Sequence, residues 1–241
     1  AYCFWTYQSK NVNNPIANAF FWASYDFMYD YTTAQEQTGK SAYSSGDNSH
    51  AIIDTHTFIH EMGHMFGLDD YYDYSRYGYT PAGGFSMQDH NVGAHDPFSA
   101  FSLGWAKAYV PKETSLIELK PFTQSGEMII LSPSWNSYNS PFDEYLIIEY
   151  YTPDGLNELD ATYKYTSSPK GPTVSGIRLW HVEARLLYSN YDIGTNPNKV
   201  NSKSTLLMSN TYDDGSARVE GYISPMGSEY ADYNLLQLIR N

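Results

Sequence analysis

Cysteine is nearly absent from this chain, since Cys3 is the only one among 241 residues. An internal disulfide needs two cysteines and a thiolate metal site needs several, so both are excluded. A cytosolic protein fits this composition, and so does an exported bacterial protein that avoids cysteine.

Basic residues are also scarce, with 14 Lys and Arg against 27 Asp and Glu and a net charge of −13. This balance argues against binding to nucleic acid or to an anionic membrane surface, because both need cationic side chains. It suits a soluble protein that binds cations. No apolar run approaches the ~18 residues that span a bilayer. There is no signal-peptide pattern, and we expect the apolar start at Ala1–Trp5 to be a cut inside a longer precursor or an expression fragment.

Hydrophobic residues make up 41% of the chain, and the 24 tyrosines predict many half-buried rings. We expect an α+β fold in two parts. Residues 1–110 form an N-terminally incomplete core with one prominent helix. Residues 111–241 form a β-rich half that packs on this core or continues it. The strands predicted by composition and turn signals are Ala1–Gln8, Ala19–Tyr25, Leu116–Leu119, Met128–Leu131, Tyr145–Tyr151, Ile177–Val182 and Thr205–Met208, and Asp96–Leu103 is a second helix.

The most informative segment, residues 60–70, reads HEMGHMFGLDD. Residues four apart share one face of a helix, so His60 and His64 can present two imidazoles to one metal ion. Glu61 is placed to reach a water bound to that metal. The alternative is that these are two surface histidines on an amphipathic helix and bind no metal.

The residues that follow favour the metal site. Gly67 lets the chain leave the helix sharply, because glycine tolerates positive φ. Asp70, six residues after His64, is then placed to return as a third ligand. Three protein ligands with one open position are typical of catalytic zinc.

The flanking sequence predicts a helix at about residues 54–66. Asp54 or Thr55 can cap its start. An apolar stripe at three- and four-residue spacing should hold it against a core: Ile59, Met62, Met65 and Phe66.

A metal-bound water has its pKa lowered toward neutrality, and a neighbouring carboxylate can take its proton and pass it to a leaving amine. Glu61 occupies the position for that general base. The residues therefore indicate zinc-assisted hydrolysis of peptide bonds.

At this point the sequence resembles a known family. The motif, continued by Tyr71-Tyr72-Asp73, is similar to the zinc signature of the immune inhibitor A peptidases, secreted bacterial enzymes related to the metzincins. The resemblance implies a metzincin-like core in which His60, His64 and Asp70 bind zinc and Glu61 is the base. Other segments that resemble the family are Phe20–Met28, Gly83–Gly93, Ala94–Trp105, Glu144–Glu149 and Gly176–Val182.

The resemblance also implies that Met87 lies in a turn beneath the metal without binding it. The alternative for Met87 is an ordinary core methionine. Asp89, Asn91 and Asp96 offer oxygen ligands of the kind calcium takes, but a solvated acidic loop explains them as well. For His56 we expect a surface position in the first helical turn.

Two rivals remain for the function. A non-catalytic binding or adhesion module on a protease-derived fold would be free to lose Glu61. A thermolysin-type enzyme would take its third ligand from Glu144 or Glu149, which would leave Gly67 and Asp70 without a role. We expect a secreted or cell-surface bacterial protein that is a monomer and acts on protein or peptide substrates, with no nucleic acid and no membrane insertion.

Overall fold

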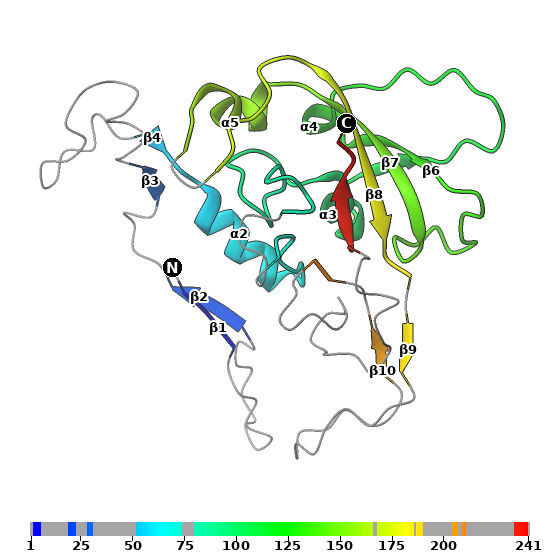
Figure 1. The fold of residues 1–241 in the computed structure, drawn as a ribbon, viewed down its shortest axis with the longest axis horizontal. Coiled ribbons are helices and arrows are strands. Elements are labelled where there is room, and N and C mark those ends of the chain that lie inside the picture. Colours follow the sequence, from blue (N-terminus) through cyan, green and yellow to red (C-terminus); the bar gives the residue numbers. More distant parts are fainter. Residues whose placement is uncertain are drawn as a thin grey trace, which may run out of the picture.

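A computed structural model describes residues 2–5, 19–22, 28–30, 52–73, 80–165, 168–185, 187–189, 204–206, 209–210 and 234–240. Within them the fold is a mixture of helices and strands built around a five-stranded mixed sheet (Figure 1). The elements are β1 (Tyr2–Trp5), β2 (Ala19–Trp22), β3 (Tyr29–Asp30), β4 (Ile52–Ile53), α2 (His56–Met65), α3 (Pro97–Ser102), β5 (Lys107–Tyr109), α4 (Phe122–Ser125), β6 (Glu127–Leu131), β7 (Glu144–Tyr151), the 3-10 helix η2 (Gly155–Asn157), α5 (Glu158–Thr162), β8 (Gly176–Glu183), β9 (Leu187–Ser189), β10 (Ser204–Leu206) and β11 (Leu236–Leu238).

The main sheet has the strand order β11-β8-β7-β6-β5. Strands β5 and β6 are parallel and the other neighbours are antiparallel. The longest pairing joins β7 to β8 from Glu144↔Glu183 to Tyr151↔Gly176. Three small antiparallel pairs, β1 with β2, β3 with β4 and β9 with β10, complete the described strands.

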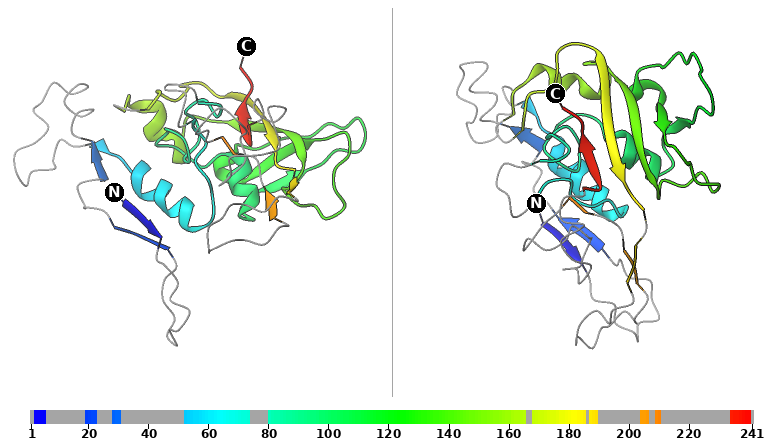
Figure 2. Two further views of the ribbon diagram at one scale, coloured as in Figure 1. Left: turned by 60° about the horizontal axis from the view of Figure 1, so that its bottom comes forward. Right: turned by 45° about the vertical axis from the view of Figure 1, so that its right-hand side comes forward.

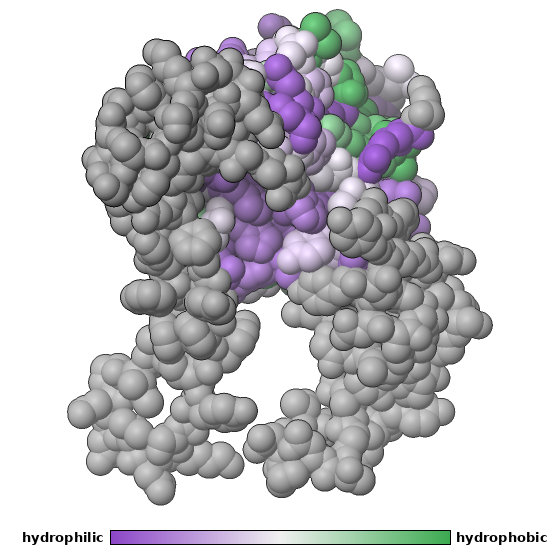
Figure 3. All heavy atoms as spheres, turned by 60° about the vertical axis from the view of Figure 1, so that its left-hand side comes forward, coloured by the Kyte–Doolittle hydropathy of each residue, from purple (hydrophilic) through white to green (hydrophobic). Residues whose placement is uncertain are grey.

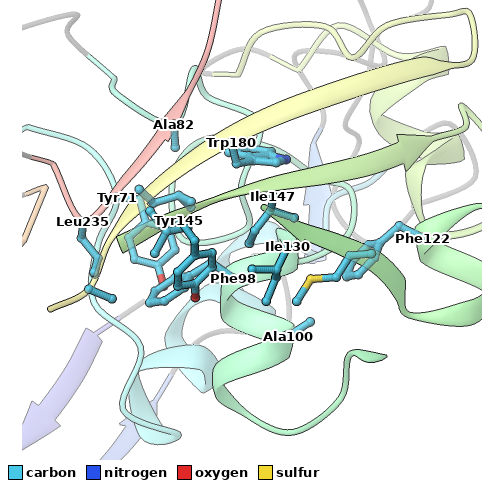
Figure 4. Close-up of a cluster of buried hydrophobic side chains, with 14 residues drawn as sticks. Tyr71, Ala82, Phe98, Ala100, Phe122, Ile130, Tyr145, Ile147, Trp180 and Leu235 are labelled. Atoms are coloured by element: carbon cyan, nitrogen blue, oxygen red, sulfur yellow. The ribbon is translucent and has the colours of Figure 1, made fainter. Parts of the chain in front are cut away.

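The core lies against one face of the sheet. Along β7 every second residue is buried, because successive side chains of a strand point to opposite faces. Ile147 from β7 and Trp180 from β8 meet Phe98 from α3 in this core (Figure 4). Asp96 caps α3 by accepting a hydrogen bond from the Ser99 amide at 2.9 Å, and the helix begins with Pro97 as the sequence predicts.

The helix α2 lies beside the sheet, and the segment 80–96 runs between them (Figures 1 and 2). This segment contacts both sides: Ala82 belongs to the core under the sheet, whereas the Met87 carbonyl contacts α2. The segment therefore connects the large core to the helix that carries the histidines.

Several elements differ from the sequence predictions. The strand predicted at Leu116–Leu119 is wrong, since these residues are irregular and Leu116 is fully exposed. The strand β5 and the short helices α4 and α5 were not predicted, because each is too short to show a hydrophobic period. The strand β5 precedes residue 111 yet belongs to the same sheet as the later strands, and the division at residue 110 stays a prediction.

Among the described residues no helix has both the length and the apolar character that a membrane crossing requires. The acidic segment that follows α2 is buried in its first part, at Asp70, Tyr71 and Asp73. Residues 74–79 lie outside the described part of the chain.

The central strand yields a prediction about stability. Ile147→Ala removes a fully buried side chain and should lower the free energy of unfolding by about 2–5 kcal/mol, measured by urea denaturation. The matched control is Ile177→Ala on β8, where the side chain is 64% exposed and the expected loss is below about 1 kcal/mol. Equal losses in the two variants would contradict the placement of the core.

Candidate metal centre

The start of α2 is fixed by its preceding acidic residue. Thr55 occupies the N-cap position but makes no side-chain cap. The Asp54 carboxylate instead accepts a hydrogen bond from the His56 amide at 2.9 Å. One of the amides left without a partner at a helix start is thereby satisfied.

The end of α2 is a glycine-dependent turn. Gly67 has a φ of +93°, and its N–H donates to the His64 carbonyl at 3.0 Å. The Leu68 N–H reaches back to the Gly63 carbonyl, also at 3.0 Å. These two bonds form a Schellman motif, which reverses the chain. Leu68 is buried, and the chain returns two residues later to place Asp70 beside the helix.

Three ligand-type atoms converge at this point. The Nε2 atoms of His60 and His64 lie 3.1 Å apart. The Oδ1 atom of Asp70 is 3.0 Å from the first and 3.2 Å from the second. Among the described residues, this is the one group of three or more His, Cys, Asp or Glu side chains arranged to hold a metal ion.

The second nitrogen of each ring determines its tautomer. The Nδ1 atom of His60 lies 2.9 Å from the Met87 carbonyl oxygen, and that of His64 lies 2.8 Å from the Leu68 carbonyl oxygen. A carbonyl oxygen can only accept, so each Nδ1 carries the proton and donates it. In the neutral rings both Nε2 lone pairs therefore face the Asp70 carboxylate, an arrangement that needs a cation between them.

The group fits zinc by geometry and by donor type. Zinc bonds to nitrogen and oxygen of about 2.0–2.1 Å imply ligand atoms about 3.3–3.4 Å apart in a tetrahedron. The observed separations of 3.0–3.2 Å are close to this edge. The side chains of His60, His64 and Asp70 are 10%, 18% and 10% exposed, so the group is largely shielded and still reachable from solvent.

The local field favours positive charge at the centre. Burial lowers the pKa of His64, but the hydrogen bond to Asp70, the one to the Leu68 carbonyl and the charges of Asp70 and Glu61 outweigh it and raise the pKa to about 9. Without a metal, a proton on His64 supplies the positive charge that the converging groups require. A metal ion bound by these residues would take the place of that proton.

Asp69 and Asp70 take different roles. The Ser209 hydroxyl donates to Asp69 Oδ2 at 2.5 Å, whereas Asp70 faces the histidines. Burial raises the pKa of Asp69, and the bond from Ser209 opposes this shift. Asn210 holds the same loop, because its side chain donates to the Tyr71 carbonyl at 2.9 Å. The loop that carries Asp70 is thus anchored by a part of the chain about 140 residues away.

Gly63 permits the closest approach in the site. A Cβ atom added there would lie 2.1 Å from the side-chain oxygen of Gln88. Gln88 is fully buried, and its side-chain amide donates to the His60 carbonyl at 3.2 Å. Its backbone carbonyl accepts a hydrogen bond from the Tyr71 amide at 2.7 Å. Gln88 was not predicted, because the glycine between the two histidines allows a close neighbour without indicating which residue it is.

Met87 is fully buried, and its carbonyl orients His60. The place of its thioether beneath the metal stays a prediction. What the structure adds is a role for the Met87 backbone, which no side-chain motif reveals.

The three residues proposed for calcium each have other partners. Asp89 accepts from the Gly84 amide at 2.8 Å and pairs with His90. Asp96 accepts from two serine hydroxyls and caps α3. The Asn91 side chain donates to the Ala94 carbonyl at 3.3 Å. Each residue thus supports the local turn, and a calcium ion at this set stays a prediction.

The expected positions of His56 and of the apolar stripe are wrong. His56 is half-buried, its ring lies 5.0 Å from that of His60, and its Nδ1 bonds to the Asn91 carbonyl at 2.6 Å. Burial, followed by the nearby His60, lowers the pKa of His56 to about 4. The buried residues of α2 are His60 and Gly63 rather than the stripe, whose members Met62, Met65 and Phe66 are exposed. The face of α2 that packs against segment 80–96 is therefore the one with His60 and Gly63, and not the expected apolar stripe.

The carboxylates of the thermolysin-type rival lie in β7 and hold other partners. Glu149 is buried, accepts from the Trp180 indole at 2.8 Å and lies 3.9 Å from Arg178. Glu144 pairs with His181 at 3.3 Å and with Arg185 at 3.1 Å. Neither joins the group of metal-ligand atoms.

The chain matches no protein-family model, no curated protein sequence and no solved structure. Figure 3 views the side where α2 lies in Figure 1, and its described surface is mostly hydrophilic.

Replacement of Gly63 by alanine should change the stability in the direction opposite to that usual for a helical glycine. Alanine normally stabilises a helix by about 1 kcal/mol over glycine. Gly63→Ala should instead destabilise the protein by about 1–3 kcal/mol, because Gln88 must leave its buried position. Chemical denaturation measures the change. Gly176→Ala, where an added Cβ meets nothing within 4 Å, is the control and should change stability little. A stabilised Gly63→Ala variant would contradict the close approach.

Proposed function

We propose that this chain is a zinc-dependent endopeptidase of the immune inhibitor A type, with a metzincin-like core. The observation that carries the proposal is the convergence of two imidazole Nε2 atoms and one carboxylate oxygen within 3.0–3.2 Å. The HExxH sequence and the glycine-dependent turn that returns Asp70 support the same conclusion.

His60, His64 and Asp70 would hold the zinc. When bound, the metal would supply a Lewis acid that lowers the pKa of a coordinated water and polarises the substrate carbonyl. The carbonyls of Met87 and Leu68 keep the two rings in the ligating tautomer. Such partners of metal-bound histidines fix ring orientation and raise ligand basicity.

Glu61 is the general base in this proposal. It follows His60 on α2, is half-buried, and lies outside the three-residue ligand group. Its charge contributes to the raised pKa of His64, which places it near the same centre. The Glu61 carboxylate takes the proton of the attacking water and passes it to the departing amine.

The wider proposal follows the family resemblance. The enzyme acts on proteins or peptides, is exported by a bacterium to the medium or the cell surface, and works as a monomer. The alternative is a binding or adhesion module on a protease-derived fold. Retention of Glu61 beside all three ligands favours the enzyme, and the two experiments below separate these cases.

The zinc content tests the ligand set. The purified chain should hold about one zinc per molecule by elemental analysis. Asp70→Asn should weaken zinc affinity at least about 100-fold, because it removes a charged ligand. Asp69→Asn keeps an acceptor for Ser209 and should change the affinity by less than about tenfold. A larger loss in the Asp69 variant would move the third ligand to that residue.

Glu61→Gln tests the mechanism. The substitution should abolish cleavage of a denatured protein substrate and leave the zinc content unchanged, since Glu61 is placed as a base. Wild-type protein that holds zinc and cleaves no protein or peptide would favour the binding module. A zinc-free Glu61→Gln variant would make Glu61 a ligand.

A further inference from the structure

A second pair of side chains stands beside the metal-ligand group. The side chain of Asp89 is fully buried, with Oδ2 held by the Gly84 amide at 2.8 Å and Oδ1 paired with His90 Nδ1. The His90 side chain is 37% exposed. A buried carboxylate thus orients an imidazole that reaches the surface.

This imidazole is close to the ligand group. Its ring lies 4.9 Å from the Tyr72 ring, and the Tyr72 ring is stacked 6.5 Å from that of His60. His90 also shares a turn with Met87, whose carbonyl orients His60. The turn that fixes one ligand therefore also fixes the place of His90.

The structure uses only one nitrogen of the His90 ring. The pair with Asp89 engages Nδ1, and within the described part of the chain His90 makes no hydrogen bond through Nε2. The Asp89 carboxylate can only accept, so Nδ1 of His90 carries the proton of this hydrogen bond. When Nε2 is protonated as well, its N–H is a charged donor that no described residue accepts.

We propose that His90, oriented by Asp89, is a catalytic residue whose Nε2–H contacts the substrate carbonyl and stabilises its oxyanion. In the attack, the water oxygen bonds to the carbonyl carbon and the π electrons move to the carbonyl oxygen. His90 donates a hydrogen bond to this oxygen and keeps its proton throughout. Removal of one such donor costs about 10²–10³ in kcat in enzymes that use them. This inference rests on the proposed peptidase function.

The test compares His90→Ala and His90→Gln with wild type, all loaded with zinc. The substrate is an internally quenched peptide that the wild type cleaves. We expect kcat of His90→Ala to fall about 10²–10³-fold with KM within about threefold. His90→Gln keeps a neutral N–H donor and should regain at least about tenfold of this loss. His181→Ala removes the same kind of His–carboxylate pair on β8, at 3.3 Å from Glu144, and should match wild type.

A binding measurement gives a readout other than turnover. Calorimetry with a phosphonate peptide that mimics the tetrahedral intermediate should show a Kd raised by about the same factor as kcat falls. Zinc content should stay at about one per chain. Unchanged kcat in His90→Ala, or a loss that follows zinc content alone, would overturn the assignment to His90 and leave the peptidase intact. A zinc-loaded wild type that cleaves no peptide would overturn both proposals together.

Discussion

The candidate centre depends on two hydrogen bonds from histidine Nδ1 atoms to backbone carbonyls. His60 donates to Met87 and His64 donates to Leu68. Without them the rings would rotate and exchange tautomers, and the Nε2 lone pairs would not face Asp70 together. Each carbonyl belongs to a turn outside α2, so the chemistry of the centre depends on how those turns pack.

The two turns are held by different means. The Leu68 carbonyl lies in the Schellman turn after α2, which needs only local sequence and Gly67. The Met87 carbonyl lies in segment 80–96, which approaches the helix because Gly63 has no side chain. One orienting bond is thus local and the other is tertiary. Damage to the core would therefore reach His60 before it reaches His64.

The sequence predicts the local parts of this site and misses the tertiary ones. Helix period and glycine chemistry predict the segment that carries His60 and His64, and the helix after Asp96 begins where its Pro and cap indicate. The prediction of which face of α2 packs against the core was wrong, because Met62 and Phe66 have helical spacing yet are exposed to solvent. Gln88 and Ser209 could not be predicted, since no pattern within one segment reports a contact 28 or 140 residues away.

The tie between Asp69 and Ser209 has a consequence for the order in which the centre matures. During synthesis the N-terminal part of a chain leaves the ribosome first. The two histidines and Asp70 are made first. Ser209 and Asn210, which anchor their loop, follow about 140 residues later, and Leu236, to which Asn210 bonds, follows later still. A nascent chain would hold the ligand residues without the support that positions Asp70. The finished centre would thus form only after β11 is in place.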